Sequence, residues 1–222
     1  MKPASVNHRD VSLQTTACCR SPRRSAWTGR LLACLAGLFG IVMTGQAQVS
    51  IYMGIGGAPG AMGATQVAPT LPGESTDIQY PKWVPVLSVQ HGMTLPATNS
   101  PGGTTTGISQ HSDVSVQKYL DSTSPSLNLL VNGVTTGLPV IKPIDYVTID
   151  FRTAGATPIV FYRMELYNVT ITSVSVSSGG DVPMESVSLK YQRIRWSYRT
   201  YANGKAGPTQ TTGWDLIKNT SF

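Results

Sequence analysis

The chain has 222 residues, a length typical of one domain, and a formal net charge of +6. Residues 1–48 hold six of the seventeen Lys and Arg residues but one of the eleven Asp and Glu residues, so residues 49–222 are close to neutral and show no electrostatic signature of nucleic-acid binding. All three cysteines (Cys18, Cys19 and Cys34) lie in the first segment, which excludes disulfides, cysteine nucleophiles and cysteine metal sites from a chain that starts near residue 49.

The first 48 residues have the pattern of an export signal. A basic stretch at residues 20–30 precedes an apolar run at 31–43 and a small-x-small end at 45–47. The apolar run is too short to cross a bilayer, which takes roughly 20 residues, and the order of the parts argues against a buried core helix. We therefore predict an export signal at residues 1–48 and one domain at residues 49–222. The paired arginines before the run leave the export route open.

The first half of the domain predicts short strands separated by loops. Alternating apolar residues predict a strand at 49–55, and a Pro- and Gly-rich loop follows at 56–76. A second strand is expected at 83–90, where Pro85 favours an edge position or a bulge because it cannot donate to a ladder. Residues 99–109 predict a flexible loop, and Val114 and Val116 mark a third strand.

One helix is expected at residues 124–130. Ser124 is a suitable N-cap, Pro125 fits the first helical position, and Gly133 can end the helix.

The second half carries the strongest strand patterns. Two half-buried antiparallel strands are predicted from the apolar faces Val147, Ile149, Phe151 and Val160, Tyr162, Met164, Leu166. Two later segments, 169–176 and 187–198, change phase midway, which predicts one β-bulge in each. Because bulges bend strands, we predict an all-β fold with a small α contribution: a compact antiparallel β-barrel or tight sandwich with one short flanking helix.

The domain offers no catalytic, cofactor or metal motif. Its two histidines, His91 and His111, lie beside loop-like sequence, outside any metal or triad spacing. The acidic residues are scattered, although carboxylates from distant strands could still meet as in a glycosidase. Arg193, Arg195 and Arg199 form a basic row on one strand, which predicts either a solvated face or contacts for self-association or acidic cargo.

Residues 183–198 closely resemble the late strand of the haemolysin-coregulated protein (Hcp) family, with its Pro-x-Glu start and Ile-x-Trp-x-Tyr end. Supporting segments occur in the family's order: Val86-Leu87-Ser88, His91-Gly92-Met93, Ser112-Asp113-Val114, Ser124-Pro125, Asn168 to Ser175, and Gly213-Trp214-Asp215.

The resemblance implies a β-barrel that assembles into hexameric rings, which stack into the type VI secretion tube, contact a spike protein and can carry small effectors. It implies no enzyme activity and no cofactor. The family is normally made without a signal peptide, so the leader is a departure, and a start at Met43 would give an ordinary cytoplasmic subunit. The alternatives are an exported Hcp-like binding module outside any tube and, less favoured, a hydrolase.

Overall fold

The computed structural model describes residues 48–100, 103–155, 157–202 and 205–222, which belong to one compact unit, Gly45–Phe222. The predicted export signal lies outside the described residues except for Gln48. No helix in the described part of the chain is long and apolar enough to cross a membrane. These residues form one helix, α1 (Ser124–Val131), and the strands β1 (Val49–Ile55), β2 (Val84–Val86), β3 (Ser88–Gln90), β4 (Met93–Thr94), β5 (Ala97–Ser100), β6 (Gly103–Thr106), β7 (Gln110–His111), β8 (Val114–Tyr119), β9 (Ile144–Thr153), β10 (Val160–Ser177), β11 (Met184–Lys190), β12 (Arg193–Ala202), β13 (Lys205–Asp215) and β14 (Thr220–Ser221).

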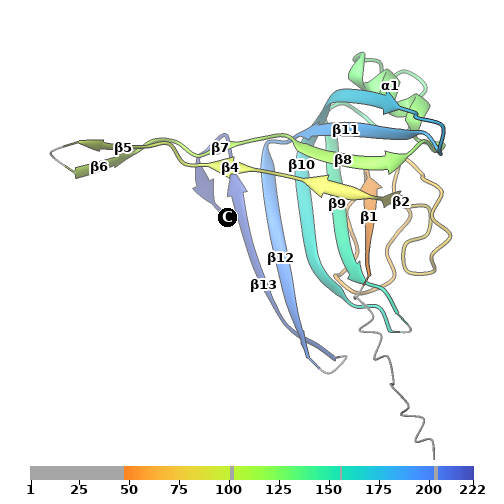
Figure 1. Cartoon of the computed structure of the whole chain (residues 1–222), viewed down its shortest axis with the longest axis horizontal. Helices are drawn as coiled ribbons and strands as arrows, with labels where there is room; N and C mark the ends of the chain where they lie inside the picture. Colours follow the sequence, from red (N-terminus) through yellow and green to blue (C-terminus); the bar gives the residue numbers. More distant parts are fainter. Residues whose placement is uncertain (1–47, 101–102, 156, 203–204) are drawn as a thin grey trace, which may run out of the picture. The chain divides into compact units, whose positions relative to one another are not determined.

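The strands form two antiparallel layers that share β10. The first layer has the order β2-β1-β9-β10-β12-β13-β14, and the second has the order β10-β11-β8-β3. Figure 1 shows the strands of the second layer, with α1 beside them, running across one end of the first. The apolar side chains of both layers and of α1 meet in one core, including Met53, Ile149, Leu127 and Leu189.

The predicted pairing of the two central strands is confirmed. Ile149 of β9 lies opposite Met164 of β10 on one side and Met53 of β1 on the other, so one apolar row crosses three strands. Burying each such side chain contributes about 1.5–3 kcal/mol.

The long strand β10 changes partners midway. Its first half pairs with β9 and β12 and its second half with β11. Asn168 marks the change with φ 51°, a left-handed conformation that Asn tolerates better than most residues. The predicted bulge is confirmed as a register shift between Ile171 and Ser173.

The second predicted bulge is wrong in kind. Residues 187–198 are not one bulged strand: β11 ends at Lys190 and β12 begins at Arg193. Between them, Tyr191 and Gln192 carry the chain from the second layer to the first, since β11 pairs with β8 and β12 pairs with β13. The change of apolar phase within residues 187–198 is therefore caused by a corner at which the chain passes from one layer to the other.

The mostly-β fold with one short helix is confirmed. A similar corner divides the predicted strand at 83–90 into β2 and β3 at Leu87, and Pro85 lies on an edge strand as expected, since β2 pairs with β1 alone. Because the ladder is interrupted at Leu87, the pairings among the described residues do not form an unbroken closed barrel.

The helix begins one residue earlier than the predicted cap at Ser124 implies. Thr123, not Ser124, is the N-cap, and it makes no side-chain capping bond. The Ser124 hydroxyl instead donates to the buried Glu185 carboxylate at 2.6 Å. Gly133, with φ 80°, follows the C-cap residue Asn132 as predicted.

A polar layer covers the face of the first layer opposite the core. Asp150 and Arg163, paired across β9 and β10, form a buried ion pair at 2.6 Å, and the Tyr80 hydroxyl donates to Asp150 at 2.8 Å. Burial raises the pKa of Tyr80 far above its usual range. The strands are therefore covered on both faces, not half-buried as predicted, because the loop that follows β1 docks on this side.

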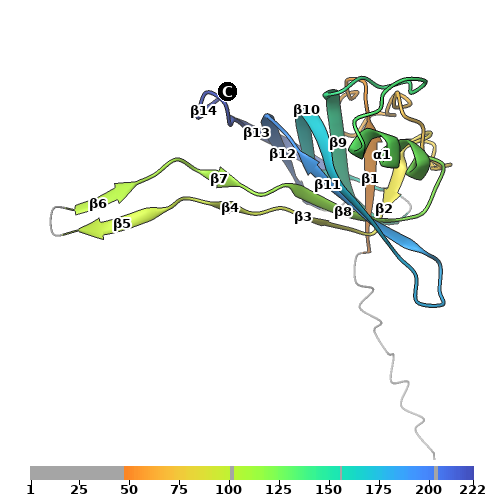
Figure 2. The ribbon, with the colours of Figure 1, turned by 90° about the horizontal axis from the view of Figure 1, so that it is seen from above.

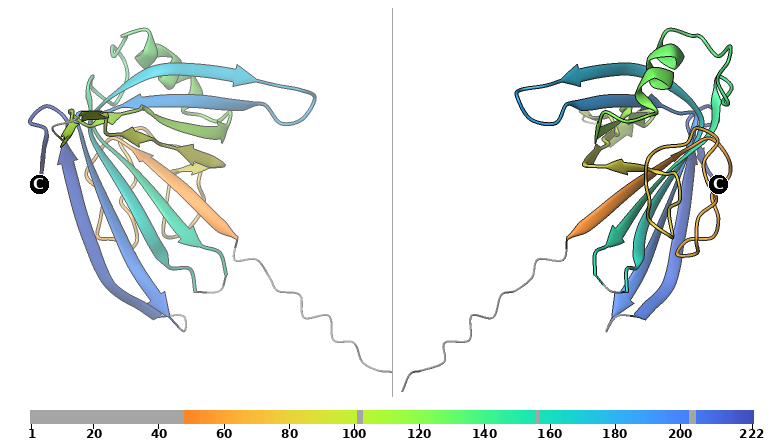
Figure 3. Two further views of the ribbon diagram at one scale, coloured as in Figure 1. Left: turned by 60° about the vertical axis from the view of Figure 1, so that its left-hand side comes forward. Right: turned by 90° about the vertical axis from the view of Figure 1, so that its right-hand side faces the viewer.

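Two ribbons extend from the layers. The predicted loop at 99–109 is wrong: β5 and β6 form a hairpin, and with β4 and β7 they build a long antiparallel arm over residues 93–111 (Figure 2). Its strands escaped prediction because their Thr-rich sequence is polar on both faces. The second ribbon is the far half of the β12–β13 pair (Figure 3), where Tyr198 and Tyr201 are 46% and 47% exposed.

Candidate functional site

The base of the arm carries a cluster of two histidines and one tyrosine. His91 follows β3, His111 lies in β7, and Tyr191 comes from the corner between β11 and β12. The Tyr191 hydroxyl lies 2.6 Å from Nε2 of His91 and 2.8 Å from Nδ1 of His111. Since a hydroxyl has one proton, it donates to one ring and accepts from the other. One hydroxyl thus ties both strands of the arm to the layers.

This cluster is neutral at physiological pH. Burial lowers the pKa of both histidines, and the neighbouring His111 lowers that of His91 further. Burial, with a contribution from the Asp113 carboxylate, raises the pKa of Tyr191 well above its usual value. The cluster therefore acts as an uncharged hydrogen-bonded joint.

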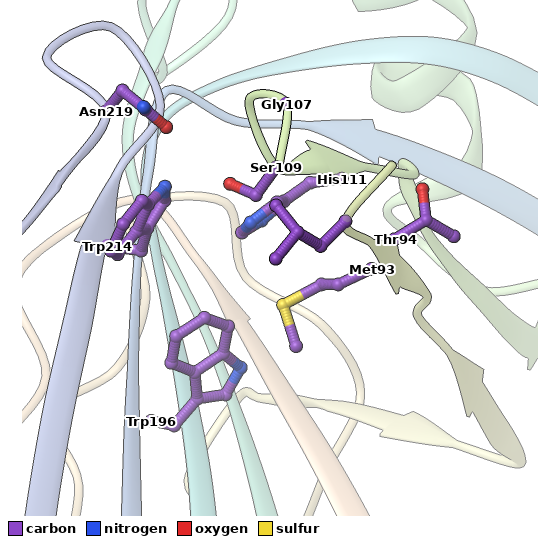
Figure 4. A pocket seen from close by; sticks show the side chains of 9 residues that line it. Met93, Thr94, Gly107, Ser109, His111, Trp196, Trp214 and Asn219 are labelled. Atoms are coloured by element: carbon purple, nitrogen blue, oxygen red, sulfur yellow. The ribbon is translucent and has the colours of Figure 1, made fainter. Parts of the chain in front are cut away.

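Beside the cluster lies a pocket of about 470 Å³ between the arm base and the β12–β13 pair (Figure 4). The indole rings of Trp196 and Trp214 face Met93 and His111 across it. None of its lining residues carries a formal charge. The remaining members are Thr94, Leu95, Gly107, Ser109 and Asn219.

Two polar atoms of the pocket wall are buried without a hydrogen-bond partner among the described residues. They are the Trp214 Nε1 donor and the Ser109 hydroxyl oxygen. Buried polar groups are normally paired, because leaving one unpaired costs about 1–3 kcal/mol. These atoms distinguish the pocket from a simple gap in the apolar packing.

The predicted basic row lies on β12 but is divided between two environments. Arg193 and Arg195 pack on the rings of Tyr167 and Phe222, 5.1–5.8 Å from the ring centroids. Arg195 also lies 3.4 Å from the Glu165 carboxylate. Arg199 lies on the projecting ribbon, where its Nε donates to the Thr209 hydroxyl at 3.0 Å. A role in self-association or cargo binding stays a prediction for all three.

Among the described acidic residues, Asp121 and Glu185 come together, but both pair with Lys118, so they do not form a glycosidase-like pair of free carboxylates. In the described part of the chain, Asp77, Asp150, Glu165 and Glu185 each face an arginine or a lysine. The same part contains no group of three His, Asp or Glu side chains that could hold a metal ion.

Sequence reasoning treated His91 and His111 as isolated loop residues, and the structure brings them together. Their joint depends on Tyr191, which lies 100 and 80 residues away along the chain. The sequence held only indirect evidence that these residues meet. Several segments that carry the family resemblance contribute residues to this region: His91-Gly92-Met93, Ser112-Asp113-Val114, residues 183–198 and Gly213-Trp214-Asp215.

These features define a mostly β protein with one short helix and a projecting two-stranded arm. The sequence profile of the type VI secretion system effector family, Hcp, matches residues 52–198. The chain belongs to this family, which is structural and non-enzymatic and typically forms hexamers. The recognition made from the sequence motifs is thereby confirmed.

Solved structures agree with this fold. A type VI secretion system protein matches with a TM-score of 0.65 and 24% identity over 79% of this chain and 100% of its own. Hcp1 from Salmonella typhimurium matches with a TM-score of 0.60 and 21% identity over 80% of this chain and 100% of its own. Hcp1 from E. coli EAEC 042, in a double-mutant form, matches with a TM-score of 0.51 and 20% identity over 75% of this chain and 97% of its own. No curated protein matches the sequence.

Proposed function

We propose that this chain is a structural subunit that assembles into hexameric rings, which stack into a type VI secretion tube. The observation that carries the proposal is the pair of projecting ribbons, the arm and the far half of β12–β13. A two-stranded ribbon is at best marginally stable in water without a further layer. Both ribbons therefore gain from being covered by another copy of the chain.

Exposed apolar side chains on the arm support the same proposal. Met93, Leu95 and Ile108 are 53%, 56% and 67% exposed, and all lie within the arm. Burying them against a second copy would remove apolar surface from water, the main driving force of association. The close balance of basic and acidic residues in 49–222 imposes little repulsion between copies.

A free strand edge offers a second contact. β13 pairs with β12 along its length, but β14 covers only Trp214 and Asp215. Since the Gly213 carbonyl also accepts from the Phe222 amide, residues 205–212 leave one edge open within the described part of the chain. Such edges readily accept a strand from another chain.

Of the three arginines in the row, only Arg199 is proposed to contact another molecule. Arg199 lies on the ribbon, so we propose that it contacts an acidic group of a neighbouring copy or of cargo. Arg193 and Arg195 hold Phe222 and shape the surface beside it.

We also propose that residues 1–48 are an export signal and that the remainder is secreted, with a spike protein and small effectors as further partners. Translation from Met43 would instead give a subunit that is cytoplasmic before secretion. N-terminal sequencing of protein from cells decides between them. An end at Gln48 or Val49 supports the signal, and an end at Met43 contradicts it.

Light scattering with size-exclusion chromatography tests self-association on the full chain. The wild type should elute as a hexamer, and the double variant Leu95→Asp/Ile108→Asp should fall to smaller species, because it places two charges in the proposed contact. Ile78→Asp is the matched control: Ile78 is 88% exposed but lies in the loop that follows β1, so it should keep the wild-type mass. Equal masses for wild type and the double variant would reject the arm contact.

A further inference from the structure

We propose that the pocket between the arm base and the β12–β13 pair binds a neutral saccharide, with a sugar ring packed on the indoles of Trp196 and Trp214. This goes beyond the proposed tube function. Because Met93 and Leu95 also belong to the proposed contact between copies, the chain offers this pocket to a saccharide in its unassembled state. Saccharide binding makes the chain a binding module as well as a subunit.

The apolar part of the pocket fits the flat C–H face of a sugar ring. Trp196 and Trp214 come from neighbouring strands, and Met93 of the arm base faces them in Figure 4. Leu95 is a further apolar residue of the lining. Aromatic rings provide a large, rigid apolar surface at low entropic cost. The pocket volume of about 470 Å³ lies in the range of small-molecule sites and is large enough for a sugar unit.

The polar part fits the hydroxyl rim of the same ring. Trp214 Nε1 can only donate, whereas the Ser109 hydroxyl can donate and accept, and both are buried without a partner among the described residues. Asn219 and Thr94 add an amide and a hydroxyl to the lining. Sugar hydroxyls can accept from the indole N–H and can donate to or accept from Ser109, which would satisfy both orphan atoms.

The absence of charge in the lining selects against other ligands. An anionic or cationic ligand would enter this pocket without a counter-charge from any lining residue, which is unfavourable at a partly buried site. A purely aromatic or aliphatic ligand would fill the volume but leave Trp214 Nε1 and the Ser109 oxygen unpaired. A neutral polyhydroxylated ring satisfies both requirements.

Titration of the full chain with maltohexaose, cellohexaose and chitohexaose tests the proposal, with indole as a hydroxyl-free aromatic comparison. The readouts are tryptophan fluorescence and the indole N–H resonances, assigned with Trp→Phe variants. At least one saccharide should shift the Trp196 and Trp214 signals saturably and leave that of Trp83 unchanged, since Trp83 lies in a separate apolar cluster. Light scattering on the same samples records the assembly state, so that loss of binding and loss of assembly are separate results.

Variants then identify the groups involved. Trp214→Phe keeps an aromatic ring but removes the donor, and Ser109→Ala removes the hydroxyl. Each should weaken saccharide binding about five- to ten-fold, the factor for one lost neutral hydrogen bond. Neither should lower the melting temperature through a lost hydrogen bond, because neither atom has a partner among the residues that the structure describes. Ser88→Ala is the control, since the Ser88 hydroxyl donates to Gln117 outside the pocket.

Three results would overturn the proposal. One is the absence of any saturable shift with the three saccharides up to their solubility limits. Another is tight binding of indole with none of the saccharides. The third is an unchanged saccharide affinity in both Trp214→Phe and Ser109→Ala.

Discussion

Glu185 and Lys118 form an ion pair in which neither side chain has any exposed surface. Glu185 is the acidic residue of the Pro-x-Glu segment that begins β11, and Lys118 lies opposite it on β8. Lys118 also donates to Asp121 at 2.8 Å, and Glu185 accepts from Ser124 at the start of α1. The pair therefore joins the second layer to the helix, which gives the glutamate of the Pro-x-Glu segment a structural role in this chain.

Removing one partner should be strongly destabilising. Lys118→Met leaves two buried carboxylates without their cation and should lower the free energy of unfolding by about 3–5 kcal/mol. The double variant Lys118→Met/Glu185→Leu should lose less than the sum of the single changes. Urea unfolding measures both, and Lys190→Met, at an exposed position of β11, is the control. A loss below about 1 kcal/mol for Lys118→Met, within the range of surface ion pairs, would contradict this role.

The stability of the domain should depend on pH through the joint at the arm base. Burial lowers the pKa of His91 and His111 in the folded chain, so the unfolded chain binds their protons more readily. The stabilisation is complete above the unfolded value of 6.5 and is lost as pH falls from there through the lowered folded pKa values. The free energy of unfolding can change by at most about 1.4 kcal/mol per pH unit for each histidine.

Urea unfolding between about pH 5 and 7, the range in which histidine titrates, measures this dependence. The double variant His91→Gln/His111→Gln should flatten the profile across that range. Asp77 does not contribute to the slope in this range, because its ordinary pKa of 3.8 already lies below it and the Arg152 guanidinium lowers the pKa further in the folded chain. An equally steep profile in the variant would reject the joint as the source.

Gly213 provides room for the C-terminal aromatic ring. A Cβ at this position would lie 2.8 Å from Cζ of Phe222, closer than packed atoms approach. Gly213→Ala should therefore displace Phe222 from Arg193 and Arg195 and cost about 1–3 kcal/mol, as overpacking does. In a Phe222→Ala background the same change should be nearly neutral. Thermal unfolding measures the cycle, with Gly179→Ala as control because its Cβ would meet nothing within 4 Å. Equal losses in both backgrounds would contradict the contact.

The corner in β10 requires a left-handed residue at position 168. Asn168→Ala should cost about 1–2 kcal/mol and Asn168→Gly much less, since only the alanine is strained at φ 51°. Asn132, with φ −78°, is the comparison site. There the glycine variant should be less stable than the alanine variant, because alanine suits a helix end better than glycine. Chemical denaturation of the four variants tests this. An equally costly glycine at position 168 would show that side-chain contacts, not backbone strain, decide the preference.

Local patterns predicted the parts of the fold that depend on one strand and its neighbour. The alternation of Val147, Ile149 and Phe151 was enough to place β9, because one face of that strand meets the core directly. The burial of Asp150 on the other face was not foreseen, since it depends on a loop without periodicity that brings Tyr80 across the sheet.

The candidate site was beyond prediction for a related reason. Trp196 was expected on a strand, whereas Trp214 was noted only as part of a family-like motif. The pocket also needs the arm base opposite them, and residues 99–109 of the arm were predicted as a loop. His91 and His111 become a joint only because the corner at Tyr191 directs one hydroxyl between them. Such arrangements follow from tertiary contacts that leave no local pattern.

Imaging of the purified full chain by electron microscopy, at the concentration where light scattering reports assembly, tests the central claim most directly. The account predicts closed six-fold rings with the arm of each subunit at a contact between copies, and loss of those rings in Leu95→Asp/Ile108→Asp but not in Ile78→Asp. A chain that remains monomeric at every concentration would contradict it.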